Sequence, residues 1–222
     1  RGTGSTQQRL ILVATSDRGL CGGFNGSIVR AVRARIGERE GEGDEVFLFP
    51  VGRKGVEQLR REYGEKFLDE RDGPGSRGPT YQDASGIGEV LLSWFEAGKF
   101  DVCEIVYNRF ESAMAQTVTF QQLVPFSGKA TGEPLLEGAT YEFEPDEEAI
   151  LEKLLPRNIE VQVFRAMLEN AASEHGARMM AMDNATRNAG DMIDKLSLTY
   201  NRTRQAMITT ELIEIVSGAE AL

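Results

Sequence analysis

The residues best placed to do chemistry lie in a glycine-rich turn near the start of the sequence. Gly19, Gly22 and Gly23 follow a short apolar run and precede a stretch with helical periodicity. Nucleotide phosphates bind at this place in doubly wound folds, because the first N–H groups of a helix face the ligand. The spacing matches neither G-x-G-x-x-G nor a Walker A loop, because Phe24-Asn25 stands where Lys-Ser/Thr would stand. The turn is therefore interpreted first as a tight connection that needs glycine for its backbone geometry, with a nucleotide site as the alternative.

The other reactive side chains form no recognisable catalytic set. Cys21 lies in the turn, but no base accompanies it, and the single histidine, His175, is far away in sequence. Asp17 and Asp101 are interpreted as solvated loop charges rather than as an acid/base pair. The sequence contains no spacing typical of metal ligands. We therefore predict no catalytic residue, no metal site and no cofactor.

Composition excludes several classes of protein. The chain has 222 residues with 25 Lys and Arg against 35 Asp and Glu, which gives a net charge of −10. Such an acidic chain repels phosphate backbones, so we expect no nucleic-acid partner. No apolar stretch is long enough to span a membrane, and no signal peptide is visible. Two cysteines without a framework pattern are typical of a reducing compartment.

Short apolar runs alternate with helical patterns in the first half of the chain, which predicts an α/β domain. Runs rich in β-forming residues predict three buried strands and one antiparallel strand, at 9–15, 45–51, 102–107 and 117–123. Apolar residues at helical spacing predict helices at 24–36, 53–63 and 83–97. The expected fold is a three-layer domain with a mainly parallel sheet over residues 1–126. Pro50 favours a strand end or an edge strand.

The second half of the chain changes character. Residues 127–156 are expected to form an acidic connector with a short helix, and residues 157–222 contain no proline. A single helix over that length would extend ~90 Å at ~1.5 Å per residue. Such a helix is too long to lie along the domain throughout, so part of it must pack on something else.

Three zones divide this predicted long helix. Residues 159–168 are apolar enough to dock on the α/β domain. Residues 182–206 carry a weak stripe of small and polar residues at a spacing of three and four, typical of one antiparallel coiled-coil partner. The last zone is apolar around more than half of the helix, which indicates that another structure surrounds it.

Three stretches follow the sequence patterns of one known protein family. Residues 15–25, Thr-Ser-Asp-Arg-Gly-Leu-Cys-Gly-Gly-Phe-Asn, resemble its T-S/T-D-x-G-L-C-G-G-x-N pattern. Residues from 172 onward, Ala-Ser-Glu-His-Gly-Ala-Arg-Met-Met-Ala-Met, resemble its A-S-E-x-x-A-R-M-x-A-M pattern. Residues from 200 onward resemble its C-terminal pattern, Y-N-x-x-R-Q-A-x-I-T-x-E-L-x-E-I-V-x-G-A. The three stretches together resemble the gamma subunit of F-type ATP synthases, in its bacterial and mitochondrial branch.

The resemblance implies a non-catalytic central rotor subunit of a proton-translocating ATP synthase. In that role a coiled coil turns inside the alpha-beta hexamer and couples c-ring rotation to conformational change at the catalytic sites. The C-terminal pattern implies contacts with the hexamer at Arg204, Gln205, Thr209, Glu211, Leu212, Ile213, Ile215 and Val216. A less specific pattern implies that Tyr141 and Glu144 contact the epsilon subunit and the c-ring.

The family pattern also includes an N-terminal helix that winds antiparallel on the C-terminal helix, and this sequence starts after it. We expect that helix to be the partner of the seam at 182–206. The resemblance further implies a peripheral location at the cytoplasmic face of a bacterial inner membrane, or at the matrix face of the mitochondrial one. Membrane contact would come only through the c-ring. The alternative remains a nucleotide-binding α/β protein that uses the Gly19–Gly23 loop.

Overall fold

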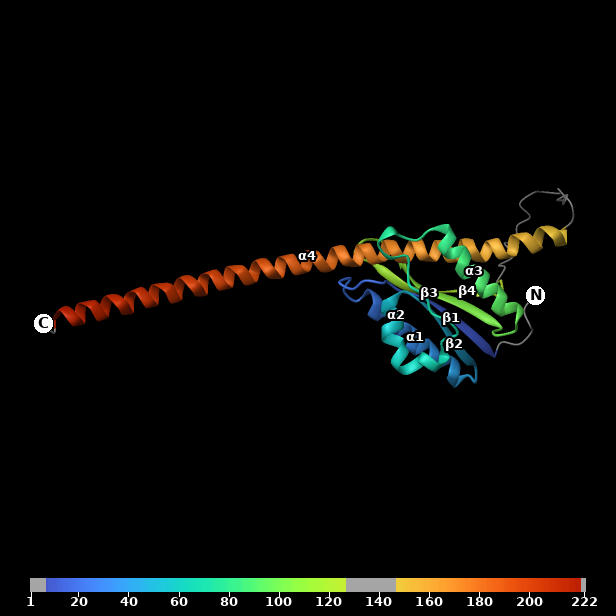
Figure 1. The fold of residues 1–222 in the computed structure, drawn as a ribbon, viewed down its shortest axis with the longest axis horizontal. Helices are drawn as coiled ribbons and strands as arrows, with labels where there is room; N and C mark the ends of the chain where they lie inside the picture. The colour runs from blue at the N-terminus through green and yellow to red at the C-terminus, as the bar shows by residue number, and fades with distance from the viewer. Residues whose placement is uncertain (1–6, 127–146, 221–222) are drawn as a thin grey trace. The chain divides into compact units, whose positions relative to one another are not determined.

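The structure, a computed structural model, describes residues 7–126 and 147–220. It divides into two units, one ending at Met180 and one beginning at Ala181. The first unit is built on a four-stranded sheet in the order β2-β1-β3-β4 (Figure 1). The strands are β1 Gln8–Ala14, β2 Glu45–Val51, β3 Val102–Phe110 and β4 Gln116–Val124. β1 pairs in parallel with β2 and β3, and β4 is antiparallel to β3.

Helices cover both faces of this sheet and complete three layers (Figure 1). Helices α1 (Phe24–Gly41) and α2 (Arg53–Tyr63) pack on one face. Helix α3 (Tyr81–Glu96) and the first part of helix α4 (Glu147–Glu220) pack on the other. Two short 3₁₀ turns, Gly64–Lys66 and Gly75–Arg77, lie between α2 and α3. The predicted fold class is confirmed.

Alternation along each strand builds the two halves of the core. Successive side chains of a strand point to opposite faces of a sheet. Leu10 and Leu12 therefore join the cluster that contains α3 and α4, and Ile11 and Val13 join the cluster that contains α1 and α2. All four are at most 2% exposed. A strand buried on both faces reads as a continuous apolar run, which is why these strands are visible in the sequence.

The outer elements show how local sequence fixes their ends. Pro50 lies on the edge strand β2, as predicted, where its lack of an N–H costs no sheet hydrogen bond. Helix α3 begins with a capping box, in which Thr80 and Asp83 each bind the other's backbone N–H group. Partial burial raises the pKa of Asp83, but the hydrogen bonds from Thr80 and the charge of Arg77 outweigh it and leave the pKa below its usual value.

Helix α4 differs in two ways from the prediction of a helix over 157–222. It begins at Glu147, so Pro156 lies inside it. The proline cannot donate to the carbonyl of Glu152, but residues 152–155 are exposed, so water can bond to that carbonyl. The compact first unit also extends to Met180, because Ile159, Val163 and Met167 are buried in the core of the α/β domain. Docking of residues 159–168 is thus confirmed, although Val161 and Leu168 remain about half exposed.

Candidate functional site

The glycine-rich turn connects the end of β1 to the start of α1. Two of its residues have positive φ, Leu20 at 63° and Gly22 at 57°, so only one of the three glycines is needed for that conformation. The Asn25 side chain holds the turn from inside: its amide donates to Ser16 Oγ at 2.8 Å, and its Oδ1 accepts the Ser16 N–H at 3.0 Å. The interpretation as a tight connection is therefore supported by the geometry of the turn.

Asp17 is not the solvated loop charge that the sequence suggested. Its carboxylate accepts the backbone N–H groups of Arg53 at 3.1 Å, Gly73 at 2.8 Å and Gly75 at 2.9 Å. Gly73 is needed for this approach, since a Cβ there would lie 2.8 Å from a carboxylate oxygen. The first N–H groups of α2, which would otherwise be available to an anion, are taken up by the β1–α1 turn: Gly55 donates to Thr15 Oγ1 at 2.9 Å.

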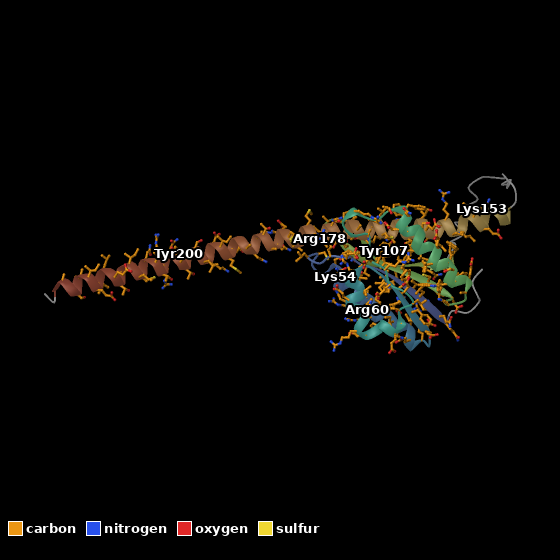
Figure 2. The ribbon with its side chains drawn as sticks, viewed as in Figure 1. Lys54, Arg60, Tyr107, Lys153, Arg178 and Tyr200 are labelled. Atoms are coloured by element: carbon orange, nitrogen blue, oxygen red, sulfur yellow. The ribbon has the colours of Figure 1, made fainter. Side chains whose placement is uncertain are left out.

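The cavity beside this turn is unfavourable for a phosphate. It lies at the carboxyl end of β1, where doubly wound folds bind their ligands. Two carboxylates, Asp17 and Glu174, are among its lining residues and outnumber its one cation, the exposed Arg18. Arg178 binds Glu174 at 2.6 Å and donates to the carbonyl of Gly19 at 3.4 Å, so its charge is already partnered. Figure 2 shows Arg178 on the part of α4 that runs beside the α/β domain.

The remaining reactive residues are not brought together. Cys21 is 2% exposed, and its Sγ accepts a hydrogen bond from Asn25 at 3.3 Å, whereas His175 is exposed on α4. Asp101 is 8% exposed and binds the N–H of Gln8 at the start of β1, the opposite end of that strand from Asp17. Among the described residues, no group of three or more His, Cys, Asp or Glu is arranged to hold a metal ion.

The second unit carries the predicted contact residues. From residue 182 to residue 219, every side chain is exposed. Leu212, Ile213, Ile215 and Val216 are between 55% and 68% exposed, an unusual state for four large apolar residues within five positions. Met207 and Ile208, one turn earlier, are 61% and 48% exposed. Together the six side chains point in directions spread over about 240° of the helix circumference, because each residue adds about 100°. No single flat partner can cover all six.

The polar contact residues share faces of the same helix. Arg204, Ile208 and Glu211 lie along one side of it, together with Tyr200. Tyr200, which Figure 2 labels, is 67% exposed. Gln205 and Thr209 are four residues apart on an adjacent face, and the Thr209 hydroxyl donates to the carbonyl of Gln205 at 2.9 Å. Thr209 thereby has its hydrogen committed to its own helix and faces a partner as an acceptor. Tyr141 and Glu144, the other predicted contact residues, lie outside the described residues.

Comparison with known proteins decides the family. A family model described as ATP synthase matches residues 2–222. The ATP synthase gamma chain of Parvibaculum lavamentivorans is 55% identical over 223 residues, which are 100% of this chain and 76% of that protein. The chain belongs to the family of ATP synthase gamma chains. The gamma chain of Rhodospirillum rubrum, 53% identical over the whole of this chain and 76% of its own length, agrees.

Solved structures support the same assignment of the gamma chain. The central stalk and c-ring of the Tetrahymena thermophila mitochondrial ATP synthase contain a chain that is 26% identical, with a TM-score of 0.66 over 84% of this chain and 80% of that one. A chain of the Euglena gracilis enzyme, at 23% identity, shares the fold with a TM-score of 0.74 over 97% of this chain and 73% of its own.

Family membership changes how the site is understood. A gamma chain is a subunit of the ATP synthase and not its catalytic one, and its role is that of the central rotor. The glycine-rich turn is then a structural element, and the exposed part of α4 is the candidate functional surface. No helix among the described residues is both long and apolar enough to cross a membrane.

Proposed function

We propose that this gamma chain couples rotation of a c-ring to conformational change at the catalytic sites of an alpha-beta hexamer. The observation that carries the proposal is the exposure of six large apolar residues between Met207 and Val216 over about 240° of the helix circumference. Apolar side chains spread this widely need a surrounding sleeve rather than a flat partner. A ring of subunits around the helix supplies such a sleeve, and an apolar lining lets the helix turn within it.

The polar residues next to these apolar side chains have a different role in the proposal. Arg204, Gln205 and Glu211 are exposed and offer charged or amide groups at fixed positions on the helix. Hydrogen bonds to charged groups contribute about 1.5–3 kcal/mol each. A few such bonds to the alpha or beta subunits hold one rotor angle against thermal motion for part of a turn. Thr209 takes part as an acceptor.

The remaining partners follow from the same assignment. The seam at 182–206 pairs with an N-terminal helix of the gamma chain, and the α/β domain contacts the epsilon subunit and the c-ring. Tyr141 and Glu144 are proposed for this second contact. The protein then lies at the inner membrane as a peripheral subunit, on the cytoplasmic face in bacteria or the matrix face in mitochondria, and reaches the membrane only through the c-ring.

Assembly is the first test of the proposal. In the Parvibaculum lavamentivorans gamma chain, the matching segment is replaced by this chain, and the chimera is expressed within the complete ATP synthase of that organism, its alpha and beta subunits included. We expect the chimera to co-purify with both subunits and to restore ATP-driven proton pumping. A chimera that folds but leaves the alpha and beta subunits behind would refute the proposal.

Substitutions at the contact residues test its finer part. We expect Gln205→Leu and Arg204→Ala to change steady-state ATP hydrolysis several-fold while leaving assembly intact. Arg202→Ala is the matched control, since that exposed arginine lies about 200° around the helix from Arg204. Wild-type hydrolysis and pumping in both variants, made singly and together, would show that these contacts do not matter.

A further inference from the structure

A buried polar cluster joins α4 to the central strand β3. Asn108 of β3 is 2% exposed, and both of its backbone groups are bound by side chains of α4. Its N–H donates to Asn170 Oδ1 at 3.1 Å, and its carbonyl accepts the Ser173 hydroxyl at 2.9 Å. Asn170 and Ser173 are 6% and 0% exposed. Two directional bonds thus connect one strand residue to one face of the helix.

The sheet topology explains why these bonds exist. The ladder between β1 and β3 ends at the pair Val13 and Val106, while β3 continues to Phe110. Beyond that point the edge of β3 has lost its neighbour, and buried backbone groups need other partners. Asn170 and Ser173 are three residues apart, so they lie on the same side of α4. Helix α4 therefore supplies the hydrogen-bond partners of β3 beyond the point where its pairing with β1 ends.

The same asparagine also reaches the opposite layer of the domain. Its side-chain amide donates to the carbonyl of Phe24, the first residue of α1, at 3.3 Å. Asn108 thereby links α4, the sheet and the start of α1 next to the glycine-rich turn.

Directional bonds constrain the helix in a way that the apolar contacts do not. Val163, Ala166 and Met167 bury α4 on the sheet, but apolar burial is non-directional and discriminates between neighbouring registers less sharply than hydrogen bonds do. A shift of α4 by one residue, about 1.5 Å, would leave the N–H and carbonyl of Asn108 buried without partners. The polar contacts thus select one register of α4.

We propose that Asn108, Asn170 and Ser173 form a register lock that fixes the first part of α4 on the sheet, so that torque passes between the sheet and this part of the helix without slippage. The inference rests on the proposed rotor function. It assigns the three residues a positioning role, since none of them touches a partner subunit in the proposal. A rotor needs such a lock because torque applied at the domain is lost if the helix slides or turns on the sheet.

The first experiment measures the register directly in the isolated chain. Spin labels are attached at Glu89→Cys on α3 and Ala172→Cys on α4, both exposed sites, while the native Cys21 and Cys103 are buried. We expect the double variant Asn170→Leu with Ser173→Ala to shift or broaden the distance distribution by about 1.5 Å or more. Asn170→Asp, which keeps the accepting oxygen, should restore the parent distribution when Ser173 is intact.

The matched control is Ser93→Ala. That exposed hydroxyl donates only within its own helix, to the carbonyl of Val90 at 2.9 Å, so its loss should change nothing. Ser173→Ala alone, the milder change, serves if the double variant does not fold. A parent-like distribution in a folded variant that lacks Ser173 or both side chains would overturn the lock.

The second experiment separates the lock from the proposed function. In the assembled chimera, we expect the double variant to retain ATP hydrolysis. The number of protons that it pumps per ATP hydrolysed should fall to about half of the parent value or less. Unchanged pumping per ATP in the variant, beside a parent chimera that pumps, would overturn the torque role of the lock alone. A parent chimera that assembles but never pumps would overturn the proposed function, and the spin-label distances would then decide the lock independently.

Discussion

The two units of this chain differ in how far their large apolar side chains are buried. In the unit up to Met180, large apolar residues such as Leu10, Val13 and Ile105 are 0% exposed. In the unit from Ala181, residues of the same kind, such as Leu198 at 75% and Leu212 at 57%, face solvent. Composition alone therefore does not distinguish the units. The first unit buries such residues in its own core, and the second unit has no core of its own among the described residues.

Hydrogen bonding follows the same division. Bonds in the first unit join residues far apart in sequence, such as Ser173 with Asn108 and Asp17 with Gly75. The side-chain bonds described for the second unit stay within one helical turn, as from Thr199 to the carbonyl of Lys195. Hydrogen bonds within a helical turn do not by themselves keep a helix folded in water, because most helical stability in proteins comes from tertiary packing. In the proposed function, the second unit gains this packing from its partners.

Hydrogen exchange should show the largest contrast between the units. In the isolated chain, we expect amides at 195–220 to exchange rapidly, because local opening there costs almost no free energy. Amides of β1 and β3 should exchange only through global unfolding, which in domains costs about 5–15 kcal/mol. Protection of 195–220 should appear when the alpha-beta hexamer is added. Full protection of these amides in the isolated monomer would contradict the comparison.

A matched pair of leucines sharpens the comparison. Leu12→Ala deletes a 1% exposed side chain in β1 and should lower the free energy of unfolding by about 2–5 kcal/mol. Leu212→Ala makes the same chemical change at a 57% exposed position and should alter it by less than about 0.5 kcal/mol. Denaturant titration of the isolated chain measures both. Equal losses would mean that Leu212 is packed within the chain after all.

Sequence patterns predicted the elements of the first unit because buried apolar residues recur along the sequence at the spacing of the strand or helix that contains them. The apolar runs of β1 and β2 and the helical spacing of α2 gave bounds that agree with the structure to within one residue. The start of α4 was missed because a proline ordinarily ends a helix, whereas here Pro156 lies next to exposed residues. Local signals therefore located the packed elements better than the exposed end of the long helix.

The polar network could not be predicted in this way. Asp17 binds N–H groups that lie 36 to 58 residues away in sequence, and no local pattern announces such partners. Asn108 and Ser173, 65 residues apart, were likewise invisible as a pair. The contact residues on α4 came from resemblance, and the structure adds only which faces of the helix they share. An exposed helix surface makes no contacts within the chain, so its structure alone does not show what it binds.

Nucleotide binding to the first unit gives the smallest expected signal, and it tests whether that unit is complete within itself. We expect calorimetry of the isolated chain with ATP, ADP and NAD to show no saturable heat. A phosphate at the carboxyl end of β1 needs free N–H groups, and the Asp17 carboxylate already accepts those of Arg53, Gly73 and Gly75. It would also approach the carboxylate of Glu174, and no Walker lysine follows the turn to offset the repulsion. Gly22→Ala is the diagnostic variant, since it adds a methyl group at a position with φ of 57° in the middle of the turn. Micromolar binding by the parent chain that disappears in a folded Gly22→Ala variant would show that the turn serves a ligand, and that the first unit is as incomplete as the second.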